Sequence, residues 1–143
     1  MSQLYHRPHY KYYLIAPLIA TSVSFFMDAL FYRLTWQFHY VDFSRTTPLA
    51  GLLVAQHLIY GILLASIFPF GYGGGKALPE GFRFGVLIGT LSFVPIGLSI
   101  RSAWYVPLNF GFYLATLQAI FQAIAIGILL AKLRSGSLEG KTV

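Results

Sequence analysis

The sequence predicts an all-α membrane protein, a polytopic bundle of four transmembrane helices in a single domain spanning residues 1–143. The chain is 57% hydrophobic and only 10% charged, whereas soluble domains carry roughly 25% charged residues. It also contains four separate apolar stretches, each near the length of about 20 residues that a spanning helix needs. This composition argues against a soluble enzyme, a disordered regulator and a nucleic-acid-binding domain, and it makes the lipid bilayer the first expected partner.

The four predicted spans cover about residues 12–34, 48–70, 83–101 and 106–132. Each should be helical, because hydrocarbon cannot satisfy backbone hydrogen-bonding groups. Asp28 is the only acidic residue in any span. The third span is short but is bracketed by Arg83 and Arg101, which reach the interfaces if their side chains snorkel.

Turn and cap residues separate the spans. Thr47 is a suitable N-cap before Pro48 at the start of the second span. Pro69 and the glycine-rich residues 71–75 end that span in a flexible turn. Residues 104–107 form a tight aromatic connection to the fourth span, and residues 135–143 are expected to be a short, frayed polar tail.

The distribution of Lys and Arg predicts the orientation in the membrane. Of the ten basic residues, seven lie on the side of the termini and three on the other side. The seven are Arg7, Lys11, Lys76, Arg83, Lys132, Arg134 and Lys141, and the three are Arg33, Arg45 and Arg101. We therefore expect cytoplasmic tails at residues 1–11 and 135–143 and a location in a bacterial inner membrane.

Local sequence matches suggest two repeated helical hairpins. Gln56 precedes the segment Gly-Ile-Leu-Leu-Ala at residues 61–65, and Gln122 precedes the same segment at residues 127–131. Residues 18–21 similarly resemble residues 87–90. If the hairpins are repeats, Gln56 and Gln122 are equivalent positions near an axis along the membrane normal.

Small residues recur every fourth position in the last two spans. Such rows let the backbones of membrane helices approach closely. They predict tight packing within one chain or between two copies, and a glycine-lined pore is the functional alternative. The residues are Gly81, Gly85, Gly89, Gly111, Ala115, Ala119, Ala123 and Gly127.

Several polar side chains lie inside the predicted spans, where an unpaired ionisable group costs several kcal/mol. Asp28 shares a helix face with Thr21, Ser24, Phe31 and Thr35, which should point into the bundle. The candidate polar cluster comprises Asp28, Gln56, His57, Gln118, Gln122 and Arg101. Arg101 or Arg33 would neutralise Asp28. This cluster predicts either a polar pathway with proton exchange at Asp28 and His57, or hydrogen bonds that hold the helices together.

The sequence contains no recognisable metal or catalytic motif. Cysteine is absent, and His6, His9, His39 and His57 share no metal-ligand spacing with a carboxylate. We therefore expect no metal, no cofactor and no enzymatic activity.

The third span is rich in glycine and ends near Pro95, and the fourth contains Gln118 and the residues Gly-Ile-Leu-Leu at 127–130. In these features residues 48–133 resemble small four-span bacterial membrane proteins of unknown function. That resemblance implies a four-helix membrane fold and assigns no catalytic residues. The shortage of reactive groups beside many packing motifs favours a role in assembly, as a homo-oligomer or an accessory subunit of a membrane complex. The alternative is a small-solute or proton-coupled transporter that uses the polar cluster.

Overall fold

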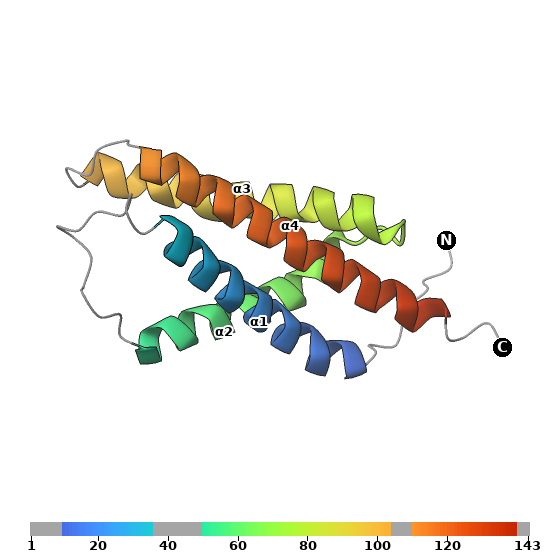
Figure 1. The fold of residues 1–143 in the computed structure, drawn as a ribbon. Helices are drawn as coiled ribbons and strands as arrows, with labels where there is room; N and C mark the ends of the chain where they lie inside the picture. The colour runs from blue at the N-terminus through green and yellow to red at the C-terminus, as the bar shows by residue number, and fades with distance from the viewer. Residues whose placement is uncertain (1–9, 36–49, 104–109, 140–143) are drawn as a thin grey trace.

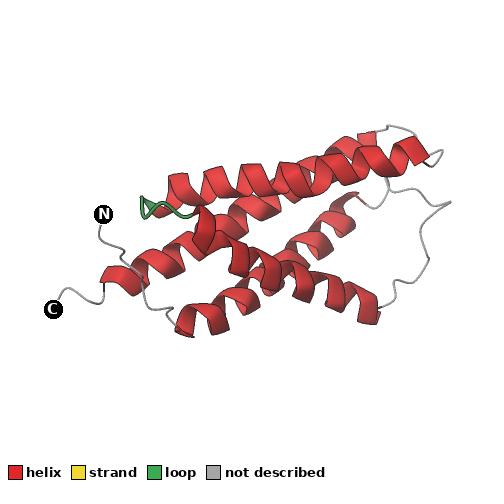
Figure 2. Cartoon of the chain, turned by 180° about the vertical axis from the view of Figure 1, so that it is seen from behind, coloured by secondary structure: helices red, strands yellow, loops and turns green. Residues whose placement is uncertain are grey.

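A computed structural model of the protein describes residues 10–35, 50–103 and 110–139. These residues form four α-helices, which are drawn in Figure 1. They are α1 (Tyr10–Thr35), α2 (Ala50–Gly71), α3 (Ala77–Ala103) and α4 (Phe110–Glu139). No strand occurs in the described ranges, as Figure 2 shows, so the predicted all-α class is confirmed.

All four helices are long and apolar enough to cross a membrane. Large apolar side chains point away from the bundle on every one of them. Representatives are Leu18 (65% exposed), Leu52 (68%), Leu87 (66%) and Phe121 (61%). A soluble protein rarely exposes apolar surface over so many elements, so these faces suit contact with lipid tails.

Two ends of the helices differ from the predicted spans by six residues or more. The third helix begins at Ala77, six residues before the predicted position, because Glu80 N donates a hydrogen bond to Lys76 O and continues a regular helix through Arg83. The fourth helix extends to Glu139, so the first residues of the predicted frayed tail are helical. The predicted cap at residues 47–48 and the connection at 104–107 lie outside the described residues.

The helices associate as two hairpins, α1 with α2 and α3 with α4. In Figure 1, α3 and α4 run side by side along most of their lengths, whereas α1 and α2 cross at a steeper angle. The hairpins meet mainly where α1 packs on α4, and α2 contacts α3 little beyond their connecting loop. The start of α1, the end of α4 and the α2–α3 loop all lie at one end of the bundle, as Figure 1 shows.

Glycines bring α3 and α4 into backbone contact. A Cβ atom added at Gly85 would lie 2.7 Å from Ala123 C and closer still to the backbone of Ile124. A Cβ at Gly89 would lie 2.8 Å from Ile120 Cα. Similar contacts join Gly81 to Gly127. This row of small residues is therefore used inside the chain, where it allows the close helix approach that membrane packing favours.

The α1–α2 crossing depends on a single glycine. A Cβ at Gly61 would lie 2.6 Å from Thr21 N and 3.0 Å from Pro17 O. Gly61 and Gly127, which the sequence matches aligned, thus both lie at the crossing within their hairpins. Gly127 packs against Gly81 on α3, whereas Gly61 packs against Thr21 on α1. These contacts are not equivalent, because the α1 residue aligned with Gly81 is Tyr12. Both hairpins therefore pack through a glycine at the helix crossing, but the register between the two helices differs.

Aromatic residues join the four helices at the end that carries the α2–α3 loop. Tyr12 donates a hydrogen bond of 3.1 Å to Ala65 O and lies 5.6 Å below the Arg134 guanidinium. Phe68, which is fully buried, contacts Tyr72 and Phe84. This end of the bundle is therefore closed by an aromatic layer under a cation.

Hydrogen bonds hold the α2–α3 loop, for which the glycine-rich sequence predicted a flexible turn. Gly73 N donates to Glu80 Oε2 over 3.1 Å, and Tyr72 Oη donates to Gly75 O over the same distance. Gly74 has a φ of 81°, which favours glycine. The carboxylate of Glu80 thus fixes a turn at the start of α3.

Candidate functional site

Three helices bring the predicted polar residues together. Ser24 and Asp28 are one turn apart on α1, and Gln118 and Gln122 are one turn apart on α4, so each pair shares a helix face. The α1–α4 contact sets these faces opposite each other. His57 enters from α2 and is only 2% exposed. We call these five side chains the polar ring.

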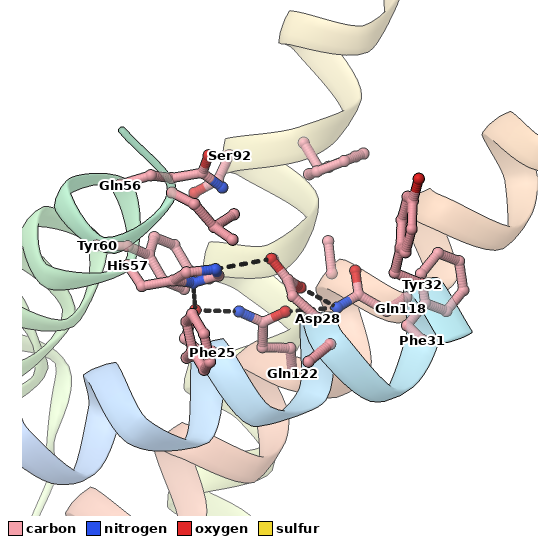
Figure 3. Close-up of a pocket in the computed structure, with 16 residues that line it drawn as sticks. Phe25, Asp28, Phe31, Tyr32, Gln56, His57, Tyr60, Ser92, Gln118 and Gln122 are labelled. Carbon is pink, nitrogen blue, oxygen red and sulfur yellow. Dashed lines mark hydrogen bonds and ion pairs between the residues drawn. The ribbon is translucent and has the colours of Figure 1, made fainter. Parts of the chain in front are cut away.

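Consecutive hydrogen bonds join the members of the polar ring. Figure 3 draws them as dashed lines, together with a dashed line for the ion pair between His57 and Asp28. Gln118 Nε2 donates to Asp28 Oδ1 and, over 2.6 Å, to Gln122 Oε1. Gln122 Nε2 in turn donates to Ser24 Oγ. Ser24 Oγ lies 2.7 Å from His57 Nδ1. The bonds of Gln118 to Asp28 and of Gln122 to Ser24 cross from one hairpin to the other.

An ionised Asp28 determines the direction of every bond in the ring. A carboxylate can only accept, so the amide group of Gln118 that faces it must be the NH₂. This orientation fixes the amide of Gln122, whose own NH₂ then faces Ser24. Ser24 therefore donates its hydroxyl proton to His57 Nδ1, and a neutral imidazole in this arrangement carries its hydrogen on Nε2.

The ring stays open between His57 and Asp28. His57 Nε2 is buried and makes no hydrogen bond with the described residues. Its nearest acidic oxygen, Asp28 Oδ2, is 3.5 Å away, which exceeds the usual N–H···O range of about 2.7–3.2 Å. A buried polar group without a partner is uncommon in native proteins, and this one faces the same space as the carboxylate.

That space is a cavity of about 800 Å³ between the two hairpins. All five members of the polar ring line it. The other walls are mostly apolar and aromatic, and they include Phe25, Phe31, Tyr32, Tyr60 and Phe93. In Figure 3 the rings of Phe25 and Tyr60 lie beside His57, and those of Phe31 and Tyr32 lie on the other side of Asp28.

The remaining predicted residues have different positions. Gln56 lines the cavity with an exposed side chain, whereas Gln122 is 5% exposed, so these two aligned residues have different surroundings. Arg33 is exposed on α1 and does not line the cavity. The surroundings of Arg101 and Gly111 lie outside the described part of the chain. Among the described residues that line the cavity there is no Lys or Arg.

The site lies near the middle of the helices. Ser24, His57 and Gln122 are within about 6 Å of the midpoints of their candidate spans, at about 1.5 Å per residue. Asp28 and Gln118 lie further from the α2–α3 loop. In the described residues no three His, Cys, Asp or Glu side chains are close enough to hold a metal ion.

Sequence patterns did not indicate the aromatic walls of the cavity. Tyr60 lies three residues after His57, and Phe25 lies three residues before Asp28, which are the spacings of neighbours on one helix face. Because aromatic residues also face lipid throughout this chain, that spacing by itself did not separate cavity residues from lipid-facing ones.

Comparison with family models, with curated proteins and with solved structures finds no match for this chain. The resemblance to small four-span bacterial membrane proteins stays a prediction. Function is therefore inferred from the chemistry of the site.

Proposed function

We propose that the protein is a proton-coupled carrier of a small solute, with the cavity between the hairpins as its solute site. The observation that carries this proposal is the cavity of about 800 Å³ bounded by a carboxylate and a buried imidazole nitrogen that makes no hydrogen bond with the described residues. Small-molecule sites usually have volumes of about 300–1,000 Å³, mostly apolar walls and a few convergent polar groups. The cavity meets each of these criteria.

The position of the cavity also supports transport. Carriers commonly bind their solutes near the bilayer midplane, at the interface between two helical units that rock against each other. Here each hairpin is held together by glycine contacts between backbones, whereas the hairpins meet mainly along α1 and α4. Rocking at that interface would leave both hairpins intact.

Protonation of Asp28 would couple to this interface. The ionised carboxylate accepts a hydrogen bond from Gln118 on the other hairpin, and such charge-assisted bonds are roughly twice as strong as neutral ones. A protonated Asp28 loses that advantage and frees the Gln118 amide to turn, which removes the constraint on Gln122. The hairpin interface would therefore differ between the two protonation states.

The small-residue row supports this function more than an assembly role. Gly81, Gly85 and Gly89 contact α4 of the same chain, so these glycines do not offer their surface to a partner. The assembly role, as a homo-oligomer or an accessory subunit, stays a prediction from the sequence. It would have to use other surfaces of the bundle.

For localisation, we propose the inner membrane of a bacterium with both termini in the cytoplasm. The support is the excess of Lys and Arg on the side of the termini and of the α2–α3 loop. The cavity then lies slightly toward the outer half of the membrane.

Cysteine labelling tests both proposals, because the chain has no native cysteine. Ser92→Cys puts a thiol in the cavity wall, and Leu91→Cys puts one at the same depth on a surface that is 65% exposed and faces lipid. In right-side-out and inside-out vesicles, an impermeant methanethiosulfonate should label Ser92→Cys from both sides and Leu91→Cys from neither. Lys76→Cys in the loop should react only in inside-out vesicles.

Each result has a clear consequence. If Ser92→Cys reacts from neither side, the cavity is closed to water and proton coupling is refuted. If it reacts from one side only, the cavity has fixed access and the protein is not a carrier. If Lys76→Cys reacts in right-side-out vesicles, the proposed orientation is wrong.

A further inference from the structure

The charge of the cavity points to the class of solute. Among the described residues that line it, Asp28 is the only acidic one, and none is Lys or Arg. The described titratable groups that line the cavity beside Asp28 are Tyr32 on α1 and His57 and Tyr60 on α2. The lining residues from α3 and α4 do not titrate: Gly89, Ser92, Phe93, Gln118, Ala119 and Gln122. With a neutral His57, the site has one negative charge in a low-dielectric environment, which favours a cation.

The aromatic walls favour the same class. Rings from three helices line the cavity, Phe25 and Tyr32 from α1, Tyr60 from α2 and Phe93 from α3. In Figure 3 the labelled rings lie on different sides of the carboxylate. The faces of aromatic rings attract cations, and they are the usual binding groups for ammonium-type ligands. The aromatic rings also provide an apolar surface for the parts of such a ligand that cannot form hydrogen bonds.

We infer that the solute is a hydrophobic organic cation that competes with a proton for Asp28. This inference rests on the proposed carrier function and names its substrate class. The cation lies against the carboxylate among the aromatic rings. A proton opposes it because protonation of Asp28 removes the negative charge that attracts the cation. The carrier therefore exchanges the cation for a proton.

Three probes of similar shape separate charge from hydrophobicity: the tetraphenylphosphonium cation, the tetraphenylborate anion and neutral triphenylphosphine oxide. Binding is measured by equilibrium dialysis to the full chain in phosphatidylcholine nanodiscs, with empty nanodiscs as the blank. We expect saturable binding of the phosphonium and not of the other two probes. The phosphonium cannot lose a proton, so any pH dependence comes from the protein. Its affinity should fall by up to about tenfold per pH unit in acid, because one proton and one cation compete for one carboxylate.

Variants connect the binding to the site. Asp28→Asn should weaken phosphonium binding by about 30-fold or more, as removal of one partner of a buried charge pair does. Glu80→Gln removes an equal charge at the α2–α3 loop and should leave binding unchanged. Tyr60→Leu should weaken binding roughly 2- to 5-fold through the lost cation–π contact. Tyr60→Phe keeps the ring and should bind like the wild type.

The possible outcomes separate this inference from the carrier proposal. Equal binding of the neutral probe would overturn the cation class and leave a solute site. Lack of saturable phosphonium binding to the folded wild type would also overturn the inference. The inference is also overturned if Asp28→Asn folds and still binds the phosphonium as tightly as the wild type. If Asp28→Asn does not fold, equal phosphonium binding by Tyr60→Leu and Tyr60→Phe would overturn it. The carrier proposal itself is decided independently by the labelling of Ser92→Cys.

Discussion

Substitution of Gly85 by alanine should separate α3 from α4. The added Cβ would lie 2.7 Å from Ala123 C and closer still to the Ile124 backbone, whereas real Cβ atoms essentially never approach within 3.0 Å. The atoms in the way belong to backbone, so no side-chain rotation relieves the overlap. The two helices must instead move apart along the row of small residues.

The cost follows from that geometry. Contacts of ordinary length, 3.4 Å or more, require a separation of roughly 1 Å, which weakens dispersion contacts along the whole seam. Overpacking of this kind costs about 3 kcal/mol when backbone must move. Alanine's higher helix propensity offsets up to about 1 kcal/mol. We therefore expect Gly85→Ala to lower the free energy of unfolding by about 2 kcal/mol.

Steric trapping of the protein in bicelles measures that free energy. Gly51→Ala is the matched control, because a Cβ there has no atom within 4 Å. It should not lower stability, and its helix propensity should raise it by up to about 1 kcal/mol. If Gly85→Ala is as stable as the wild type, α3 and α4 are not in backbone contact at this position and the reasoning fails. An equal loss in Gly51→Ala would show that the effect is not one of packing.

Two further substitutions test individual hydrogen bonds by the same assay. Ser24→Ala removes two bonds of the polar ring and should cost about 1–2 kcal/mol. Ser66→Ala removes only a bond within an exposed helix turn and should be nearly neutral; equal effects would contradict a special role for the ring. Tyr12→Phe removes the bond to Ala65 O and should cost about 0.5–1.5 kcal/mol. Tyr13→Phe is the control and should leave stability unchanged, because the Tyr13 side chain is 46% exposed. If Tyr12→Phe is as stable as the wild type, the hydrogen bond to Ala65 O does not contribute to stability.

The polar ring has two compatible physical roles. Its hydrogen bonds join α1, α2 and α4, and each such bond in a membrane protein contributes roughly 0.6–2 kcal/mol. Cohesion alone, however, does not require a cavity or an unpartnered nitrogen beside the carboxylate. The proposed ligand-binding role accounts for His57 Nε2 and Asp28 Oδ2, which lie 3.5 Å apart without a hydrogen bond between them.

The sequence by itself determined the four helices and their membrane character. A run of apolar residues must be helical in hydrocarbon, since only the helix satisfies its own backbone. The spacing of Gly81, Gly85 and Gly89, and of Asp28 with Ser24, also follows from local helical geometry. These properties depend on one segment at a time, so no tertiary information is needed to derive them.

Only the tertiary structure decided which of these faces meet. Most apolar surfaces pack almost equally well against lipid and against another helix, so composition does not select a pairing or a register. Backbone contacts at Gly61 and Gly85 fix the hairpins, and the α1–α4 contact then joins Asp28 to Gln118 while Gln56 stays exposed. The cavity is a property of all four helices together, because each contributes a wall that its own sequence does not distinguish from a lipid-facing surface.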